Sequence, residues 1–121
     1  MKKIKNLTIG KLYRLRGASY IGSGLAKSAK NDPVQPSRHN TTDKFVYELK
    51  PGSTYIFESK ETVDVDVEAI VVTSDILSTT GLNISTIYLP EGYTGSVHGV
   101  LNLDSSLTII ETDTVIGCVI I

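Results

Sequence analysis

The stretch ETVDVDVEAIVV (residues 61–72) decides the predicted fold class. Val63, Val65 and Val67 alternate with three acidic residues, so one face of an extended segment is apolar and the other charged. A period of two residues is typical of a half-buried β-strand. We therefore expect a strand here, with the three valines on one buried face.

Apolar runs on both sides of this stretch repeat the same signal, because they are rich in β-branched and aromatic residues. The segment IKNLTIGKLYRLR (4–16) predicts one or two strands, broken at Gly10. The other predicted strands are KFVYEL (44–49), STYIFES (53–59), LNISTIYL (82–89), SVHGVLNL (96–103), SLTIIET (106–112) and TVIGCVII (114–121).

Turn-forming residues divide these runs at Pro51-Gly52, Pro90–Gly95, Asp104-Ser105 and Thr112-Asp113. The segment SDILSTTGL predicts one short turn of helix after Ser74, ended by Gly81. Eight or more short strands without crossover helices predict an all-β barrel or sandwich. We expect one domain over 1–121, with a long irregular segment at about 17–42 that is functional, disordered, or an arm onto a partner.

Composition narrows the class of protein. No run reaches the ~18 apolar residues of a membrane span, so we expect no membrane partner. The N-terminus lacks the apolar core of a signal peptide. We therefore expect an intracellular or virion protein that is not secreted by a signal peptide. The single cysteine excludes an internal disulfide and a cysteine-based metal site.

Charge is uneven along the chain. Residues 1–50 hold 11 of the 12 Lys+Arg and 3 of the 13 Asp+Glu, a net +8, and residues 51–121 carry a net −9. The two halves either mix on one surface or bring a basic face to an acidic neighbouring subunit or to phosphate. No cluster of Lys and Arg is dense enough to predict nucleic acid binding.

Few residues offer catalytic or metal chemistry. His98 and Cys118 lie in predicted strands, and the spacing of a metal site is absent, so we expect neither a metal nor a cofactor. Ser74 opens the short helical turn, where backbone N–H groups either bind an anion or donate to the Ser74 side chain in an ordinary N-cap. We favour the N-cap.

Four segments together resemble the trimeric dUTPase and dCTP deaminase superfamily, and GASYIG (17–22) adds a weaker likeness to its first motif. YELKPGSTYIFESKETVDVDVEAIVV resembles that superfamily's run into the second motif, TSDILSTTGL its second motif, LPEGYTG its third, and DTVIGCVII its fourth. The resemblance implies a dUTPase-like distorted, jelly-roll-like β-barrel and a homotrimer with sites between subunits.

The same motifs depart from the family at the positions that carry chemistry. Ser74 and Asp75 stand where the family has a phosphate-binding arginine and a serine. Pro90 stands at the place of the aspartate that activates water, and proline cannot act as a general base. The fourth motif's arginine and glutamine are Val115 and Cys118. We therefore expect a catalytically degenerate member with no catalytic residues.

Three function classes follow. The first is a non-catalytic trimeric module for structure or interaction, such as a phage capsid decoration protein. The second is a protein that binds or sequesters a nucleotide without turnover. The third is an active dUTP pyrophosphatase or dCTP deaminase with relocated groups. For the second, the candidate nucleotide-binding residues are Tyr93, Gly81, Leu82, Ser74, Lys27, Lys30 and Arg38.

Overall fold

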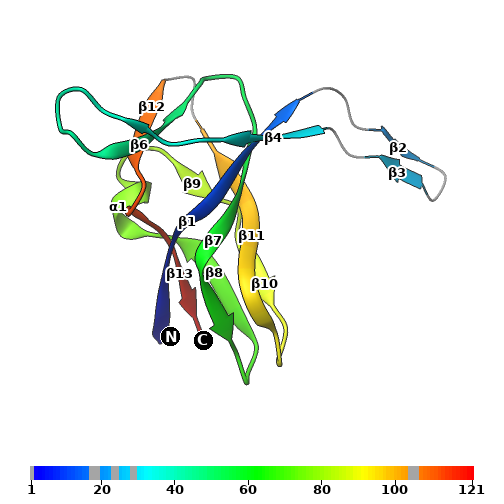
Figure 1. The fold of residues 1–121 in the computed structure, drawn as a ribbon. Coiled ribbons are helices and arrows are strands. Elements are labelled where there is room, and N and C mark those ends of the chain that lie inside the picture. The colour runs from blue at the N-terminus through cyan, green and yellow to red at the C-terminus, as the bar shows by residue number, and fades with distance from the viewer. Residues whose placement is uncertain (1, 17–19, 23–24, 28–29, 104–106) are drawn as a thin grey trace.

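The computed structural model describes residues 2–16, 20–22, 25–27, 30–103 and 107–121 (Figure 1). These residues form an all-β protein with one short helix, as the sequence predicts. The elements are β1 (Lys3–Arg16), β2 (Tyr20–Gly22), β3 (Leu25–Lys27), β4 (Lys30–Val34), β5 (Ser37–Arg38), β6 (Phe45–Leu49), β7 (Tyr55–Asp64), β8 (Ala69–Thr73), α1 (Asp75–Ser78), β9 (Asn83–Ile84), β10 (Ile87–Leu89), β11 (Thr94–Asn102), β12 (Thr108–Glu111) and β13 (Val115–Ile120).

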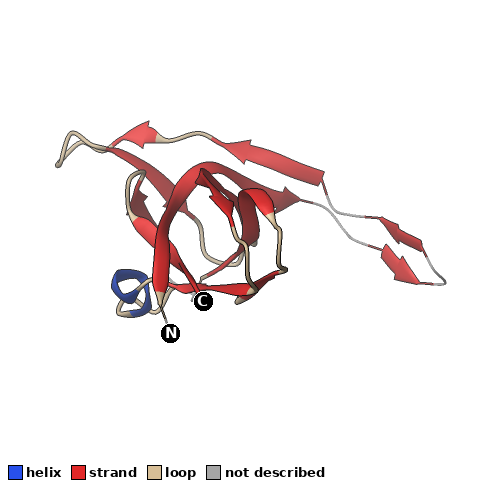
Figure 2. Cartoon of the chain, turned by 90° about the horizontal axis from the view of Figure 1, so that it is seen from below, coloured by secondary structure: helices blue, strands red, loops and turns tan. Residues whose placement is uncertain are grey.

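One large sheet dominates the molecule. Its strands run in the order β10-β8-β13-β1-β7-β11-β9, with β4 paired to the second half of β1. Figure 2 shows this sheet curling around the core, so that it forms a curled half-barrel. A smaller sheet has the order β12-β6-β5, and its residues Tyr47, Leu49 and Ile110 pack in the same core as the large sheet. We call the large and small sheets together the body.

Strand β1 links the two halves of the large sheet. Its first half pairs with β13 and its second half with β7 and β4, and the register shifts between Ile9 and Lys11. A Cβ atom at Gly10 would lie 2.8 Å from the Lys60 Cα, closer than real side chains approach. Gly10 therefore lets two strands approach closely and does not break the segment in two.

The core fills the concave side of the large sheet. Its largest fully buried side chains are Tyr55, Phe57, Leu7, Leu12, Leu49, Leu101, Ile116, Val71, Val97 and Val119. Burial of side chains of this size is the main stabilising contribution in a domain of this length. Every helix in the described part is too short and too polar to cross a bilayer.

The stretch 61–72 is not one strand. Strand β7 ends at Asp64, the chain turns through 65–68, and β8 begins at Ala69. Val63 and Val65 are buried as predicted, but Val67 is 47% exposed, so its predicted burial is wrong. Both backbone groups of Val65 bond to the turn at 92–93, and the chain then bends at 66–67, where Val67 lies at the surface.

The segment 17–42 contains short strands, so the prediction that it is irregular is wrong in the described part. Strand β4 includes Pro33, opposite Tyr13 of β1. Proline is tolerated there because β4 has a partner on one side only. Strands β2 and β3 pair antiparallel, and we call this pair of strands (20–22 and 25–27) the arm, which projects away from the body (Figure 1, Figure 2).

Other boundaries agree or shift slightly. The predicted strand 82–89 divides into β9 and β10. The turns at Pro51-Gly52 and Thr112-Asp113 are confirmed, while Asp104-Ser105 lies outside the described residues. The short helix is confirmed as α1, although its C-cap is Thr79, and Gly81 follows two residues later.

Candidate functional site

Ser74 acts as a structural N-cap. Its Oγ accepts a hydrogen bond from the Leu77 N–H at 3.3 Å and donates one to the Val115 carbonyl oxygen at 2.6 Å. The residue is buried, and its backbone N–H donates to the Ile116 carbonyl oxygen. The side chain therefore joins α1 to the start of β13. Its hydroxyl hydrogen is donated to the Val115 carbonyl oxygen and is not available to a ligand.

Gly81 and Leu82 follow the helix and complete this local structure. Gly81 has a φ of 84°, in the left-handed region that favours glycine, and Leu82 is buried in the core. Both residues therefore direct the chain from α1 back into the body, where Leu82 packs among apolar neighbours.

The turn that contains Tyr93 is also held from within. The Gly92 N–H donates to the Val65 carbonyl oxygen at 2.8 Å, and the Tyr93 N–H donates to the Pro90 carbonyl oxygen at 3.0 Å. The Tyr93 ring packs against the core, and its hydroxyl donates to the Ser96 carbonyl oxygen at 2.5 Å. This turn joins β10, which pairs with β8, to β11, which pairs with β7, so it is not a simple hairpin.

Strand β8 separates the two predicted parts of the nucleotide site within one chain. Ser74 follows its last residue, whereas Leu89, just before the Tyr93 turn, pairs with its first residue, Ala69. Five strand residues span about 16 Å. The structure brings Ser74, Gly81 and Leu82 together around α1 and leaves Tyr93 at the other end of the strand.

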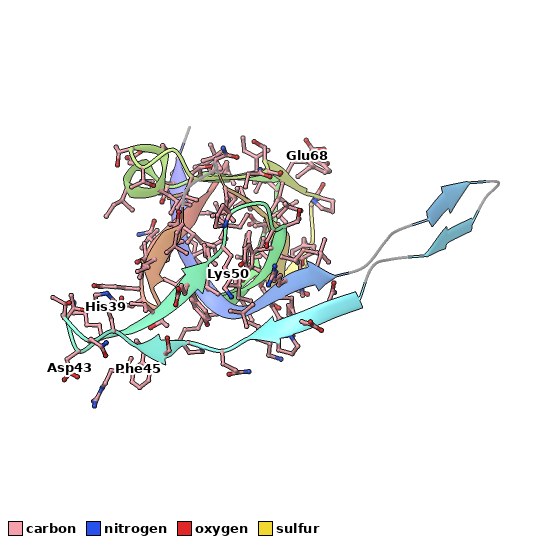
Figure 3. The ribbon with its side chains drawn as sticks, turned by 90° about the horizontal axis from the view of Figure 1, so that it is seen from above. His39, Asp43, Phe45, Lys50 and Glu68 are labelled. Carbon is pink, nitrogen blue, oxygen red and sulfur yellow. The ribbon has the colours of Figure 1, made fainter. Side chains whose placement is uncertain are left out.

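The predicted cations occupy different places. Lys27 ends β3 in the arm, and Lys30 begins β4 at the base of the arm. Arg38 lies in β5, where its Nε is 3.0 Å from the Asp43 Oδ1, and both side chains are mostly exposed. An exposed ion pair of this kind contributes little to stability. Figure 3 shows Asp43 beside His39 and Phe45, far from Glu68 across the body.

The histidines and the cysteine have structural surroundings. His98 is 60% exposed, with its Nε2 3.6 Å from the Glu58 Oε1, and the His39 Nδ1 lies 3.3 Å from the Thr42 Oγ1. Cys118 is buried, as predicted, and its thiol donates to the Asn6 Oδ1. Across the described residues, no three His, Cys, Asp or Glu side chains converge as metal ligands would.

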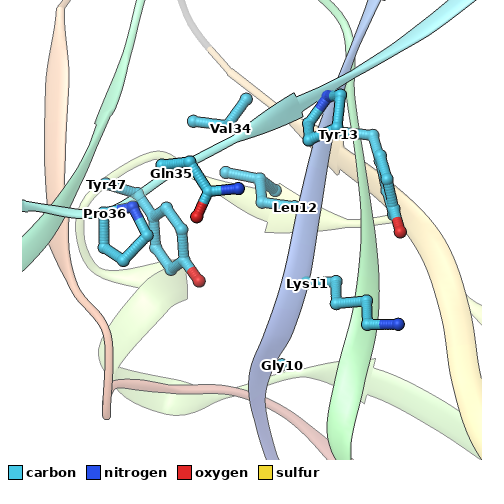
Figure 4. A pocket seen from close by; sticks show the side chains of 9 residues that line it. Gly10, Lys11, Leu12, Tyr13, Val34, Gln35, Pro36 and Tyr47 are labelled. Carbon is cyan, nitrogen blue, oxygen red and sulfur yellow. The ribbon is translucent and has the colours of Figure 1, made fainter.

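A groove of about 530 Å³ lies between β1, the chain after β4, and β6 (Figure 4). Tyr47 and Gln35 point into it from one side, and Lys11 and Tyr13 from β1 line the other. Burial raises the pKa of the Tyr47 hydroxyl. Within the described part of the chain, neither the Tyr47 hydroxyl nor the Gln35 amide has a hydrogen-bond partner, so both can meet a ligand.

Sequence reasoning missed this groove. Its lining residues come from three segments of the chain, and the local signal in the sequence is a pair of prolines, Pro33 and Pro36, that flank Val34 and Gln35. None of the predicted nucleotide-binding residues lines it.

Glu61 makes a two-point contact across strands. Its Oε1 accepts from the Thr8 N–H at 2.7 Å and its Oε2 from the Thr8 hydroxyl at 2.6 Å. Partial burial raises the pKa of this carboxyl, but the two bonds from Thr8, with help from Lys60, outweigh it and hold the pKa below 4.5. The contact therefore ties β1 to β7 in the ionised state.

Comparison with models of known protein families and with curated proteins found no match for the chain. The resemblance to the dUTPase superfamily therefore remains a hypothesis that rests on the quoted motifs.

Proposed function

We propose that this chain is a non-catalytic β-domain that serves as a homotrimeric structural or interaction module. The observation that carries the proposal is the arm. Strand β2 pairs only with β3 among the described elements, and the hairpin extends away from the body. An isolated two-stranded hairpin is marginally stable in water, so a partner is needed to hold it.

The groups at the family's motif positions support the absence of turnover. Ser74 is committed to a cap and to the Val115 carbonyl oxygen, and Tyr93 is committed to packing and to Ser96. Pro90 contributes only a backbone carbonyl oxygen to its turn. A dUTPase-like scaffold whose site residues have become structural is suited to assembly.

A homotrimer is the proposed assembly, because three copies related by a closed three-fold axis satisfy head-to-tail contacts without free ends. A symmetric shell such as a phage capsid offers matching three-fold positions. This step to a capsid rests on architecture alone.

Two measurements test the proposal. Sedimentation of the full chain at micromolar concentration should give the mass of three copies, and a monomer would contradict the trimer. Co-purification from infected or producing cells should place the protein on large particles, and its absence from them would contradict the capsid assignment.

The groove in Figure 4 supports a second candidate, binding of a nucleotide without turnover. Lys11, whose Nζ lies 3.7 Å from the Glu58 Oε2, offers a cation that would have to exchange this exposed ion pair for a phosphate. Tyr13 and Tyr47 offer aromatic faces, and Gln35 offers an amide to a base or sugar. Thermal unfolding with a panel of nucleotides tests it. A ligand at a hundredfold excess over Kd should stabilise the protein by about 2.7 kcal/mol, and no shift across the panel removes this candidate.

A further inference from the structure

We propose that the groove in Figure 4 is a binding site for an uncharged sugar ring, either of a saccharide or of a nucleoside. Its volume of about 530 Å³ is in the range of pockets that hold small molecules. The site goes beyond the proposed structural role of the chain. It also narrows the second candidate function, because it assigns recognition to the ring and not to a phosphate.

The groove lies at an interruption of the large sheet beside β1. Strand β1 pairs with β13 up to Thr8 and with β4 from Leu12 onward. Residues 9–11 between them have β7 on one side and no strand on the other among the described elements. Three strand residues span about 10 Å. An extended peptide paired with β1 here would meet β13 at one end and β4 at the other, so the opening suits a compact ring.

Tyr47 places an uncommitted hydroxyl in this opening. The residue is only 5% exposed, and its ring packs in the core. Within the described part of the chain, its hydroxyl has no hydrogen-bond partner, and neither has the amide of Gln35 beside it. Burial raises the pKa of the Tyr47 hydroxyl, so it keeps its proton and can donate. Both groups donate and accept hydrogen bonds, as the hydroxyl groups of a sugar do.

Apolar side chains and rings line the remainder of the groove. Tyr13 lines it from β1, and Pro33 and Pro36 line it from β4 and the chain that follows. Leu12 and Val34, which are paired across β1 and β4, also line it. These side chains offer apolar surface to the C–H faces of a sugar ring, while the few polar groups fix its orientation.

The charge of the groove is balanced. Among the described residues that line it, Lys11 alone is charged, and its Nζ lies 3.7 Å from the Glu58 Oε2. The Glu58 Oε1 accepts a hydrogen bond from the Ser96 hydroxyl at 3.2 Å. A phosphate would have to draw Lys11 away from this pair, whereas an uncharged ring leaves the pair in place. The groove therefore favours a neutral ligand.

Titration of the isotopically labelled full chain, followed by the amide chemical shifts in NMR spectra, tests the site. The saccharide arm uses glucose, galactose, N-acetylglucosamine and their linear trimers, and the nucleoside arm uses adenosine and uridine. We expect saturable shifts at Gly10, Leu12 and Gln35 with ligand at up to about 10 mM, about tenfold above a Kd of about 1 mM. Saturation in the saccharide arm supports a glycan as the source of the ring, and saturation in the nucleoside arm supports a nucleoside.

Two variants test the assigned contacts. Tyr47→Phe keeps the buried ring and removes the hydroxyl, so it should weaken binding about three- to tenfold. Gln35→Ala truncates an exposed side chain, so it should weaken binding by a similar factor while the chain stays folded. The matched controls Tyr88→Phe and Asn40→Ala lie at exposed sites outside the groove and should bind as the parent chain does.

The absence of saturable binding in both arms would overturn this inference, and so would binding that is unchanged in Tyr47→Phe and Gln35→Ala. Monophosphates of the two nucleosides that bind more than about tenfold tighter than the nucleosides would also overturn it, because phosphate recognition would then dominate. Sedimentation measures the trimer separately. Failure of the sugar site therefore leaves the proposed structural module intact, and a monomeric chain that binds sugar overturns the trimer alone.

Discussion

The turn around Ser74 and the arm differ in how far they are bonded to the rest of their own chain. Ser74, which stands at a family motif position, has its hydroxyl and its backbone N–H bonded inside the same chain. The arm, which carries only the weakest motif likeness, pairs with no other element of its own chain in the described part. The difference teaches that the Ser74 motif position maintains the fold, whereas the arm is the region that we propose for interaction.

The largest effect should come from the core of the body. Phe57→Ala removes a fully buried ring and leaves a cavity, which should reduce the free energy of unfolding by about 3–5 kcal/mol. Urea denaturation measures the change. The control Phe45→Ala truncates a ring that is 54% exposed and should cost far less. Equal losses in the two variants would mean that the body is not packed as described.

The Ser74 side of the comparison is tested by Ser74→Ala. The change leaves the Leu77 N–H and the Val115 carbonyl oxygen without their partner, so stability should fall by about 1–2 kcal/mol. Thr79→Ala removes an exposed hydroxyl of the same helix and serves as the control. If Ser74→Ala left stability unchanged, the structural role assigned to this motif position would be wrong.

Glu61 offers a smaller, pH-dependent test of the body. Its pKa is lower in the folded chain than the ordinary value of 4.5, so its stabilising contribution is complete above that value and is lost as the pH falls through the folded pKa. Glu61→Gln should therefore destabilise the protein near neutral pH, and the deficit should shrink below pH 4.5.

Denaturant unfolding at several pH values measures this profile. Thr8→Val, which removes the hydroxyl donor, should show part of the same deficit. A deficit in Glu61→Gln that grows as the pH falls would contradict the assignment.

Removing the arm should have the smallest effect on the free energy of unfolding of the body. Replacing residues 17–29 by a short Gly-Ser linker leaves every core residue in place, so the free energy of unfolding of the isolated body should change by less than about 1 kcal/mol. Urea denaturation under dilute conditions, where the parent chain is dissociated, makes the measurement. A large loss would show that the arm belongs to the fold and would remove the contrast on which the proposed function depends.

The sequence predicts the class of fold well, because alternating and β-branched residues fix strand character locally. The all-β class, the buried Cys118 and the helical turn after Ser74 are confirmed. The exposure of Val67 was not predicted, because the alternation of apolar and acidic residues continues without interruption through the bend at 66–67 that divides β7 from β8. Strand β4 was missed because Pro33 signals a loop, and only the edge position makes it acceptable.

The candidate sites are less predictable than the fold. The N-cap at Ser74 is a local interaction, and the sequence favours it correctly. The groove beside Tyr47 combines residues from strands far apart in the chain, and no local pattern marks it as a site. The dUTPase-like fold and the trimer remain predictions.

The most direct test of the central claim is the sedimentation mass of the parent chain beside that of the arm-replaced chain at the same micromolar concentration. We expect three copies for the parent chain and one folded copy for the variant. A parent chain that sediments as one copy, or a variant that still assembles as three, would contradict the account.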